Sequence, residues 1–171
     1  TTLSMAGIEP PEYVDGRAFA GKFQSSESRQ YIHAAADRFD RQYDTIRAVR
    51  DERFKYLRNY YPERGYYLPL TYREQMPIMQ ELLRLKEQDA LTEAQSQWFR
   101  ESKPSEELFD TLSDPHELTN LALDPAYSDK LLELRKELDR WLSGFDDMGM
   151  MPESDLINEI WPGMEQPVTS S

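Results

Sequence analysis

Residues 46–59 read Ile46-Arg-Ala-Val-Arg-Asp-Glu-Arg-Phe-Lys-Tyr-Leu-Arg-Asn59. Aliphatic and aromatic side chains alternate with charged ones on both sides of Asp51-Glu52, and this period of two is typical of half-buried strands. We therefore predict a β-hairpin with strands at 45–50 and 53–60, joined by a two-residue link. Glu52 fits a tight primed turn poorly, because glycine is usual there, so the pattern defines the register only to within one residue.

The strongest helical pattern of the chain follows Asp124-Pro125. Aspartate caps free amides at a helix start, and proline suits the first helical position. The apolar residues that follow recur at helical spacing on one face, namely Leu131, Leu134, Leu138, Trp141, Leu142 and Phe145. This face must be buried against another element. We expect it to pack on the sheet of the hairpin; a coiled-coil partner is the alternative, although two heptads are short for one.

Shorter patterns complete an α+β fold. An apolar run at 31–36 predicts a buried strand, and 108–112 predicts the last strand of a small antiparallel sheet. Additional helices are predicted at 73–88 and at 153–161, where apolar residues recur on one side.

Two local signals predict further helix starts. Thr92 and Gln95 have the spacing of a capping box, which would begin a helix that carries Trp98. Asp114-Pro115 with Glu117 has the same design as the start at Asp124.

Composition restricts the class of protein. The 171 residues are 39% apolar and 30% charged, which is typical of a soluble chain with a core. There is no run of about 18 apolar residues, so we expect no membrane span. The sequence contains no cysteine, which excludes disulfides, thiolate metal sites and a cysteine nucleophile within this chain.

The charge distribution is uneven. The net charge of −12 would repel a polyanion such as DNA, so we expect no nucleic-acid partner. Basic residues nevertheless concentrate in one stretch, at Arg38, Arg41, Arg47, Arg50, Arg53, Lys55, Arg58 and Arg64. This basic strip could face an anionic ligand, or it could balance charge on a half-exposed sheet.

Chemical motifs are scarce. His33 and His116 are far apart in the sequence, and neither has other metal-binding residue types at ligand spacing. A histidine inside an apolar strand, as His33 is, more often has a packing role than a catalytic one. No glycine-rich phosphate loop and no nucleophile elbow is present. The residues alone therefore indicate an α+β module of a small antiparallel sheet and helices.

Three segments, in the correct order, resemble the sulfatase family. The first is Leu3-Ser-Met-Ala-Gly-Ile-Glu-Pro-Pro-Glu12 followed by Asp15-Gly-Arg17, similar to the end of the last helix of the catalytic domain. The second is 46–59, similar to the hairpin of the C-terminal subdomain. The third is Glu107-Leu-Phe-Asp110 with Asp114-Pro-His-Glu117 and Asn120-Leu-Ala122, similar to the final strand and the turn before the terminal helix.

The resemblance implies the fold and the domain organisation. The family has a large α/β domain of the alkaline-phosphatase-like type, followed by a small antiparallel sheet packed against a C-terminal helix. On this basis, residues 1–30 would be the end of the catalytic domain with a connecting loop, 31–145 the C-terminal subdomain, and 146–171 a tail or linker. A helix that already ends near residue 6 agrees with a chain that starts inside a larger domain.

The resemblance also implies a chemistry that this chain lacks. Sulfatases hydrolyse sulfuric esters with a formylglycine made from Cys or Ser in a Cys/Ser-x-Pro-Ser-Arg motif, beside a calcium ion. Here the nearest serine version, Ser113–Glu117, ends in Glu where Arg is needed. We therefore assign no catalytic, cofactor or metal residue to this chain. Calcium, a sulfated carbohydrate substrate and an N-terminal catalytic domain as partner are expected for the parent enzyme, in the periplasm or outside the cell.

One contribution to substrate binding is predicted on the same basis. In the family, the loop before the hairpin approaches the mouth of the active-site pocket, and here that loop is 36–41. Asp37 and Arg38 are the main candidates for the substrate rim, with His33 and Arg41 as weaker ones. Arginine can hold a sulfate or carboxylate by paired hydrogen bonds. The alternative is a structural salt bridge to the catalytic domain.

Two other functions stay open on the sequence. The chain could be a stand-alone module that binds sulfated glycans through the basic strip, or an interaction protein that uses the apolar helix face for a partner. Under the sulfatase hypothesis the isolated chain is inactive.

Overall fold

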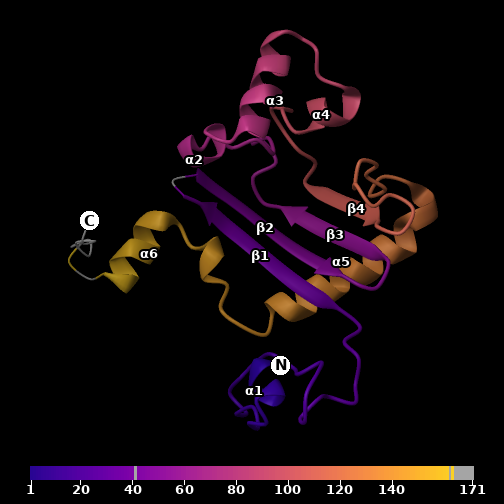
Figure 1. Ribbon diagram of the computed structural model, residues 1–171, viewed down its shortest axis with the longest axis vertical. Helices are drawn as coiled ribbons and strands as arrows, with labels where there is room; N and C mark the ends of the chain where they lie inside the picture. The colour runs from indigo at the N-terminus through magenta and orange to yellow at the C-terminus, as the bar shows by residue number, and fades with distance from the viewer. Residues whose placement is uncertain (41, 162, 164–171) are drawn as a thin grey trace. The chain divides into compact units, whose positions relative to one another are not determined.

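A computed structural model describes residues 1–40, 42–161 and 163 (Figure 1). The chain divides into two compact units, Thr1–Gln30 and Tyr31–Ser171. The second unit has the expected α+β fold, with an antiparallel sheet and helices.

The sheet is a four-stranded antiparallel meander in the order β1-β2-β3-β4. Its strands are β1 (Ile32–Phe39), β2 (Gln42–Arg50), β3 (Phe54–Asn59) and β4 (Glu106–Asp110). The predicted hairpin is confirmed as β2 and β3, although residues 51–53, one more than predicted, lie between the strands. Its turn needs no glycine, because the Asp51 carboxylate accepts hydrogen bonds from the backbone N–H groups of Arg53 (2.8 Å) and Phe54 (2.6 Å).

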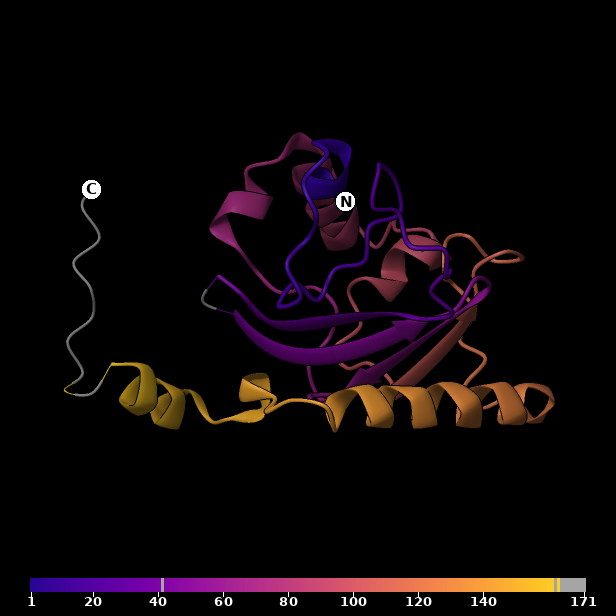
Figure 2. The same ribbon diagram turned by 90° about the horizontal axis from the view of Figure 1, so that it is seen from below.

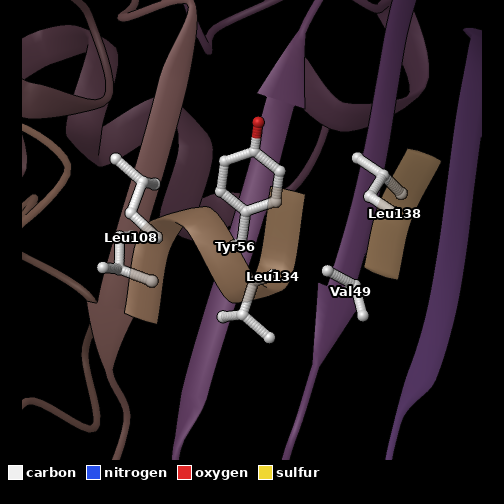
Figure 3. Packing of buried hydrophobic residues seen from close by; sticks show 6 residues of the cluster. Val49, Tyr56, Leu108, Leu134 and Leu138 are labelled. Atoms are coloured by element: carbon white, nitrogen blue, oxygen red, sulfur yellow. The ribbon is translucent and has the colours of Figure 1, made fainter. Parts of the chain in front are cut away.

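The core lies between the sheet and α5 (Ser128–Leu142), which covers one face (Figure 2). Neighbouring strands place Val49, Tyr56 and Leu108 in one row across the sheet. Leu134 and Leu138 of α5 are fully buried against this row (Figure 3). The predicted packing of the leucine face on the sheet is confirmed.

The opposite face of the sheet carries the segment between β3 and β4 (Figure 2). Its helices are α2 (Thr71–Glu74), α3 (Pro77–Glu87) and α4 (Glu93–Gln97). The single helix predicted at 73–88 is wrong, because proline disfavours the helical conformation of the residue before it and has no N–H to continue the ladder. Met76 is accordingly extended, and α3 begins at Pro77. The capping box of Thr92 and Gln95 is confirmed at the start of α4, which ends just before Trp98.

Two further predictions need correction. The strand at 31–36 is an edge strand whose residues are largely exposed, with Ile32 at 55%, because β1 has a neighbouring strand on one side alone. Asp114-Pro115 starts no helix. Glu117 has a left-handed backbone (φ 54°), and the Asp114 carboxylate accepts from the N–H of Thr119 (2.8 Å), so it closes a loop instead of capping a helix.

The end of the described chain contains short helices. Asp124 caps a 3₁₀ turn, η1 (Pro125–Tyr127), that leads directly into α5, as its sequence predicts. Beyond α5 lie η2 (Met148–Met150) and α6 (Glu153–Ile160), and the latter confirms the predicted last helix. None of the described helices has the length and apolar character that crossing a bilayer requires.

The first unit is organised around Ser4 of α1 (Thr2–Met5). Its buried hydroxyl accepts from the N–H of Phe23 (2.9 Å), and its carbonyl accepts from the N–H of Lys22 (3.2 Å). Gly21 has φ +93°, and a Cβ there would lie 2.5 Å from the Ser4 carbonyl carbon. Glycine is therefore required where the loop folds back on α1.

We predict that Leu134→Ala destabilises the protein by about 3 kcal/mol, because it leaves a cavity between α5 and the sheet. Leu132→Ala is the matched control, since Leu132 is on the same helix and 47% exposed, and it should change the free energy of unfolding by less than about 0.5 kcal/mol. Urea unfolding followed by circular dichroism measures both. Equal losses in the two variants would contradict the assigned packing.

Candidate functional site: an arginine–aromatic cleft at the β1–β2 hairpin

The middle of β2 holds a buried arginine. Arg47 is 1% exposed, and its guanidinium makes two hydrogen bonds to the Asp147 carboxylate, at 2.8 and 2.6 Å. A second carboxylate, Asp37 of β1, lies 2.7 Å from the same guanidinium. Hydrogen bonding to Arg47 lowers the pKa of Asp147 below its ordinary value. We call these three residues the Arg47 triad.

The Arg47 triad fixes the segment after α5 on the sheet. A Cβ on Gly149 would lie 2.2 Å from Oδ1 of Asp37 and 2.3 Å from Nη2 of Arg47, so a side chain there would displace this ion pair. The Gly149 carbonyl in turn accepts from the Tyr43 hydroxyl (3.0 Å). The start of the predicted tail or linker thus makes close contacts with β1 and β2.

Each predicted rim residue that the structure describes has a partner within this chain. Asp37 belongs to the Arg47 triad. Arg38 binds Glu153 (2.7 Å), and its guanidinium lies 5.4 Å from the centre of the Tyr43 ring. Arg41 lies outside the described residues. A β-bulge between Ala36 and Arg38 interrupts the ladder here, and bulges of this kind redirect side chains.

His33 contacts α5 and joins neither Asp37 nor Arg38. Its Nε2 lies 2.9 Å from Oε1 of Glu137, and its ring stacks on Trp141 at 4.9 Å with an interplanar angle of 10°. Arg140 above all, and His33 in addition, lower the pKa of Glu137 through hydrogen bonds. These contacts attach the edge strand to the end of α5. A role of His33 at the substrate rim stays a prediction, as it does for Asp37, Arg38 and Arg41.

A cleft lies where the predicted rim loop meets the segment between β3 and β4. Its volume is about 220 Å³. Its lining combines aromatic, aliphatic and charged side chains, namely Ala36, Arg38, Phe39, Asp44, Ile46, Tyr66, Leu68, Arg73 and Trp98. Residues 36–39, which the structure places in β1 and not in the predicted loop, form one wall with Asp44 and Ile46 of β2. The residues from 66 to 98 form the other wall. We call this the Arg73 cleft.

Arg73 of α2 (Thr71–Glu74) makes cation–π contacts with two rings. Its guanidinium carbon lies 5.0 Å from the centre of the Phe39 ring and 5.5 Å from that of Trp98. Nη1 donates to the Leu68 carbonyl at 3.3 Å. No carboxylate of the described residues forms an ion pair with Arg73, unlike Arg38 and Arg47. Sequence reasoning missed this residue, because no local motif connects Arg73 with an aromatic from β1 and another from beyond α4.

A buried polar network supports the wall of the cleft. Lys103, whose side chain is completely buried, donates to both carboxylate oxygens of Asp44 at 2.9 and 2.8 Å, and so balances the charge of the one carboxylate in the lining. The Tyr66 hydroxyl donates to buried Glu107 at 2.6 Å. Burial first, and then this bond, raise the pKa of Tyr66 well above its ordinary value.

Among the residues that the structure describes, no cluster of three or more acidic or histidine side chains has the arrangement of a metal site. The carboxylates of the second unit that are most buried are instead bound by cations or amides, as for Asp44, Asp110 and Glu107. This donor set does not fit the calcium ion that the family resemblance implies.

Comparison with known proteins finds sulfatases. A curated ulvan-active sulfatase of Formosa agariphila is 62% identical over 171 residues, which are 99% of this chain and 28% of that protein. The resemblance to sulfatases is confirmed. A second ulvan-active sulfatase of the same organism is 25% identical over 153 residues, covering 86% of this chain and again 28% of the relative. The chain thus spans less than a third of the curated sulfatases it matches. No family model matches.

Solved sulfatase structures support the fold. A putative sulfatase of Bacteroides thetaiotaomicron superposes with a TM-score of 0.54 at 24% identity, covering 86% of this chain and 24% of its own. A 2-O GAG sulfatase gives a TM-score of 0.54 at 23% identity with the same coverages. These shares are consistent with a C-terminal subdomain of a sulfatase.

We predict that Asp147→Ala destabilises the protein by about 3 kcal/mol at pH 7, because it removes one partner of a buried arginine. The folded-state pKa of Asp147 is lowered, so its stabilisation is present above its unfolded pKa, about 3.9, and is lost as the pH falls through the folded value. The difference between the variant and the wild type should therefore shrink at acidic pH.

The matched control is Asp146→Ala, which removes the adjacent, exposed carboxylate. Urea unfolding at several pH values measures the effect. A difference from the wild type that does not change with pH would contradict the assigned pairing.

Proposed function

We propose that this chain serves as the C-terminal subdomain of a sulfatase that removes sulfate esters from a sulfated polysaccharide. The observation that carries the proposal is the 62% identity to an ulvan-active sulfatase along practically the whole chain. Ulvan, which gives the relative its name, is accordingly the substrate to test first.

The catalytic groups would come from another part of the same protein. This chain has no cysteine, and its serines stand in no formylglycine motif, so the nucleophile is proposed to lie in the N-terminal catalytic domain. Calcium is proposed for that domain as well, since Asp147 and Asp44 of this chain are already paired with Arg47 and Lys103. The sulfate would be neutralised there by metal and basic side chains while the hydrated aldehyde attacks sulfur.

The contribution of this subdomain would be a rigid wall beside the substrate. β1 and β2 are fixed on one face by the Arg47 triad and α5, and on the other by the Lys103–Asp44 pair. Such support keeps residues 36–40 of the predicted rim loop in a defined position, which a substrate rim requires. Asp37 and Arg38 are the proposed rim residues on this loop, with His33 and Arg41 as further candidates.

A second candidate function is a module that binds sulfated glycans without a catalytic domain. The Arg73 cleft favours it, because this cleft contains a cation and aromatic side chains within the present chain. A polysaccharide substrate lies outside the cytoplasm, so under either function we propose a periplasmic or secreted protein.

We predict that the complete protein containing this chain releases inorganic sulfate from ulvan, and that the 171-residue chain alone releases none. In the complete protein, Arg38→Ala should lower kcat/KM at least about tenfold, because a charged hydrogen bond to the substrate is lost. Arg84→Ala is the control, since Arg84 is exposed and pairs with Glu81 on its own helix. Ion chromatography of the released sulfate provides the rates.

Sulfate release by the chain alone would overturn the assignment of the catalytic centre to another domain. An unchanged kcat/KM in Arg38→Ala would remove Arg38 from the substrate rim. Absence of sulfate release from ulvan by the complete protein would reject ulvan as the substrate.

A further inference from the structure

The Arg73 cleft contains a pre-positioned donor of hydrogen bonds. The guanidinium carbon of Arg73 lies 5.0 Å from the centre of the Phe39 ring and 5.5 Å from that of Trp98, and these cation–π contacts restrict the movement of the side chain. The Leu68 carbonyl accepts one hydrogen bond from Nη1. Guanidinium has five N–H donors, so further donors are available to an acceptor with two or more oxygens. A planar group fixed in this way loses little entropy when it binds an anion.

The charge balance of the cleft favours an anion. Of the charged residues in the lining, Arg38 is paired with Glu153 and Asp44 with Lys103. Arg73 has no carboxylate partner among the described residues, so it contributes an uncompensated positive charge. This stands out in a chain with a net charge of −12, where most of the arginines around the sheet are bound by carboxylates.

The other side chains of the cleft favour a sugar as the carrier of that anion. Trp98 is 39% exposed and Phe39 is 55% exposed, so aromatic surface is open to solvent beside the cation. Such rings offer an apolar face to the C–H groups of a sugar. The volume of about 220 Å³ is below the range of pockets for drug-sized ligands and suits one sugar unit of a longer chain.

We propose that the Arg73 cleft binds a sulfated sugar unit of a polysaccharide. Arg73 donates paired hydrogen bonds to the sulfate oxygens, and the Trp98 indole packs against the sugar ring. The binding itself needs no catalytic group, whereas the choice of a sulfated polysaccharide as the ligand class rests on the proposed function.

The test is affinity electrophoresis of the 171-residue chain in gels that contain ulvan or chemically desulfated ulvan. Intact ulvan should retard the wild-type chain, and desulfated ulvan should retard it at least about tenfold less. Arg73→Ala and Trp98→Ala should each raise the dissociation constant for intact ulvan at least about tenfold. Arg84→Ala is the matched control, because it removes the same charge from an exposed, paired arginine, and it should bind as the wild type does.

Two conservative variants distinguish a loss of binding from a loss of folding. Arg73→Lys keeps the charge but loses the planar fork, and it should bind more weakly than the wild type. Trp98→Phe keeps an aromatic ring and should retain most of the binding. Circular dichroism verifies that each variant has the wild-type secondary structure.

Three results would overturn the proposal. These are no retardation of the wild-type chain by ulvan, equal weakening in Arg73→Ala and Arg84→Ala, and equal retardation by intact and desulfated ulvan. The outcome is separable from that of the proposed function. If the chain binds ulvan but the complete protein releases no sulfate from it, the proposed binding by the Arg73 cleft stands and ulvan is rejected as the substrate of the sulfatase. If the complete protein releases sulfate but the chain does not bind ulvan, only the proposed binding by the cleft is rejected.

Discussion

The contact between the leucine face of α5 and the row of Val49, Tyr56 and Leu108 organises the whole second unit. α5 is the last long helix of the described chain, whereas the three residues of this row come from the earlier strands β2, β3 and β4. Burying a leucine contributes about 2 kcal/mol, so a few such residues account for much of the stability of a small domain. Every other feature of the sheet depends on the strands being held in this order.

Beyond the end of α5, ion pairs instead of apolar contacts hold the chain on the sheet. On the face of the sheet that α5 covers, the Arg47 triad closes the part beyond the end of this helix. The opposite face is supported by the buried pair of Lys103 and Asp44. Buried pairs add little net stability compared with apolar residues, but breaking one is costly. They therefore specify one arrangement of the β1–β2 hairpin. That arrangement places Phe39 beside Arg73 and Trp98, which is the geometry that gives the cleft its character.

Local and periodic features of this fold could be predicted from the sequence. The hairpin, the leucine face and the Thr92 capping box depend on neighbouring residues, and the sulfatase resemblance rests on the same segments. The prediction of one helix at 73–88 did not take Pro77 into account, although this proline is a local signal for a new helix start. The partners of Arg38 and His33 could not be predicted, because Glu153 and Glu137 lie 115 and 104 positions away along the chain. The Arg73 cleft could not be predicted for the same reason, since its residues come from three separate segments that meet only in the folded chain.

Amide hydrogen exchange followed by mass spectrometry tests the central claim, that α5 and the sheet form one cooperative structure. The account predicts that peptides from β2, β3 and α5 are the slowest to exchange and share one opening free energy, since they can open only together. Rapid exchange throughout α5, while the β2–β3 hairpin stays protected, would contradict it.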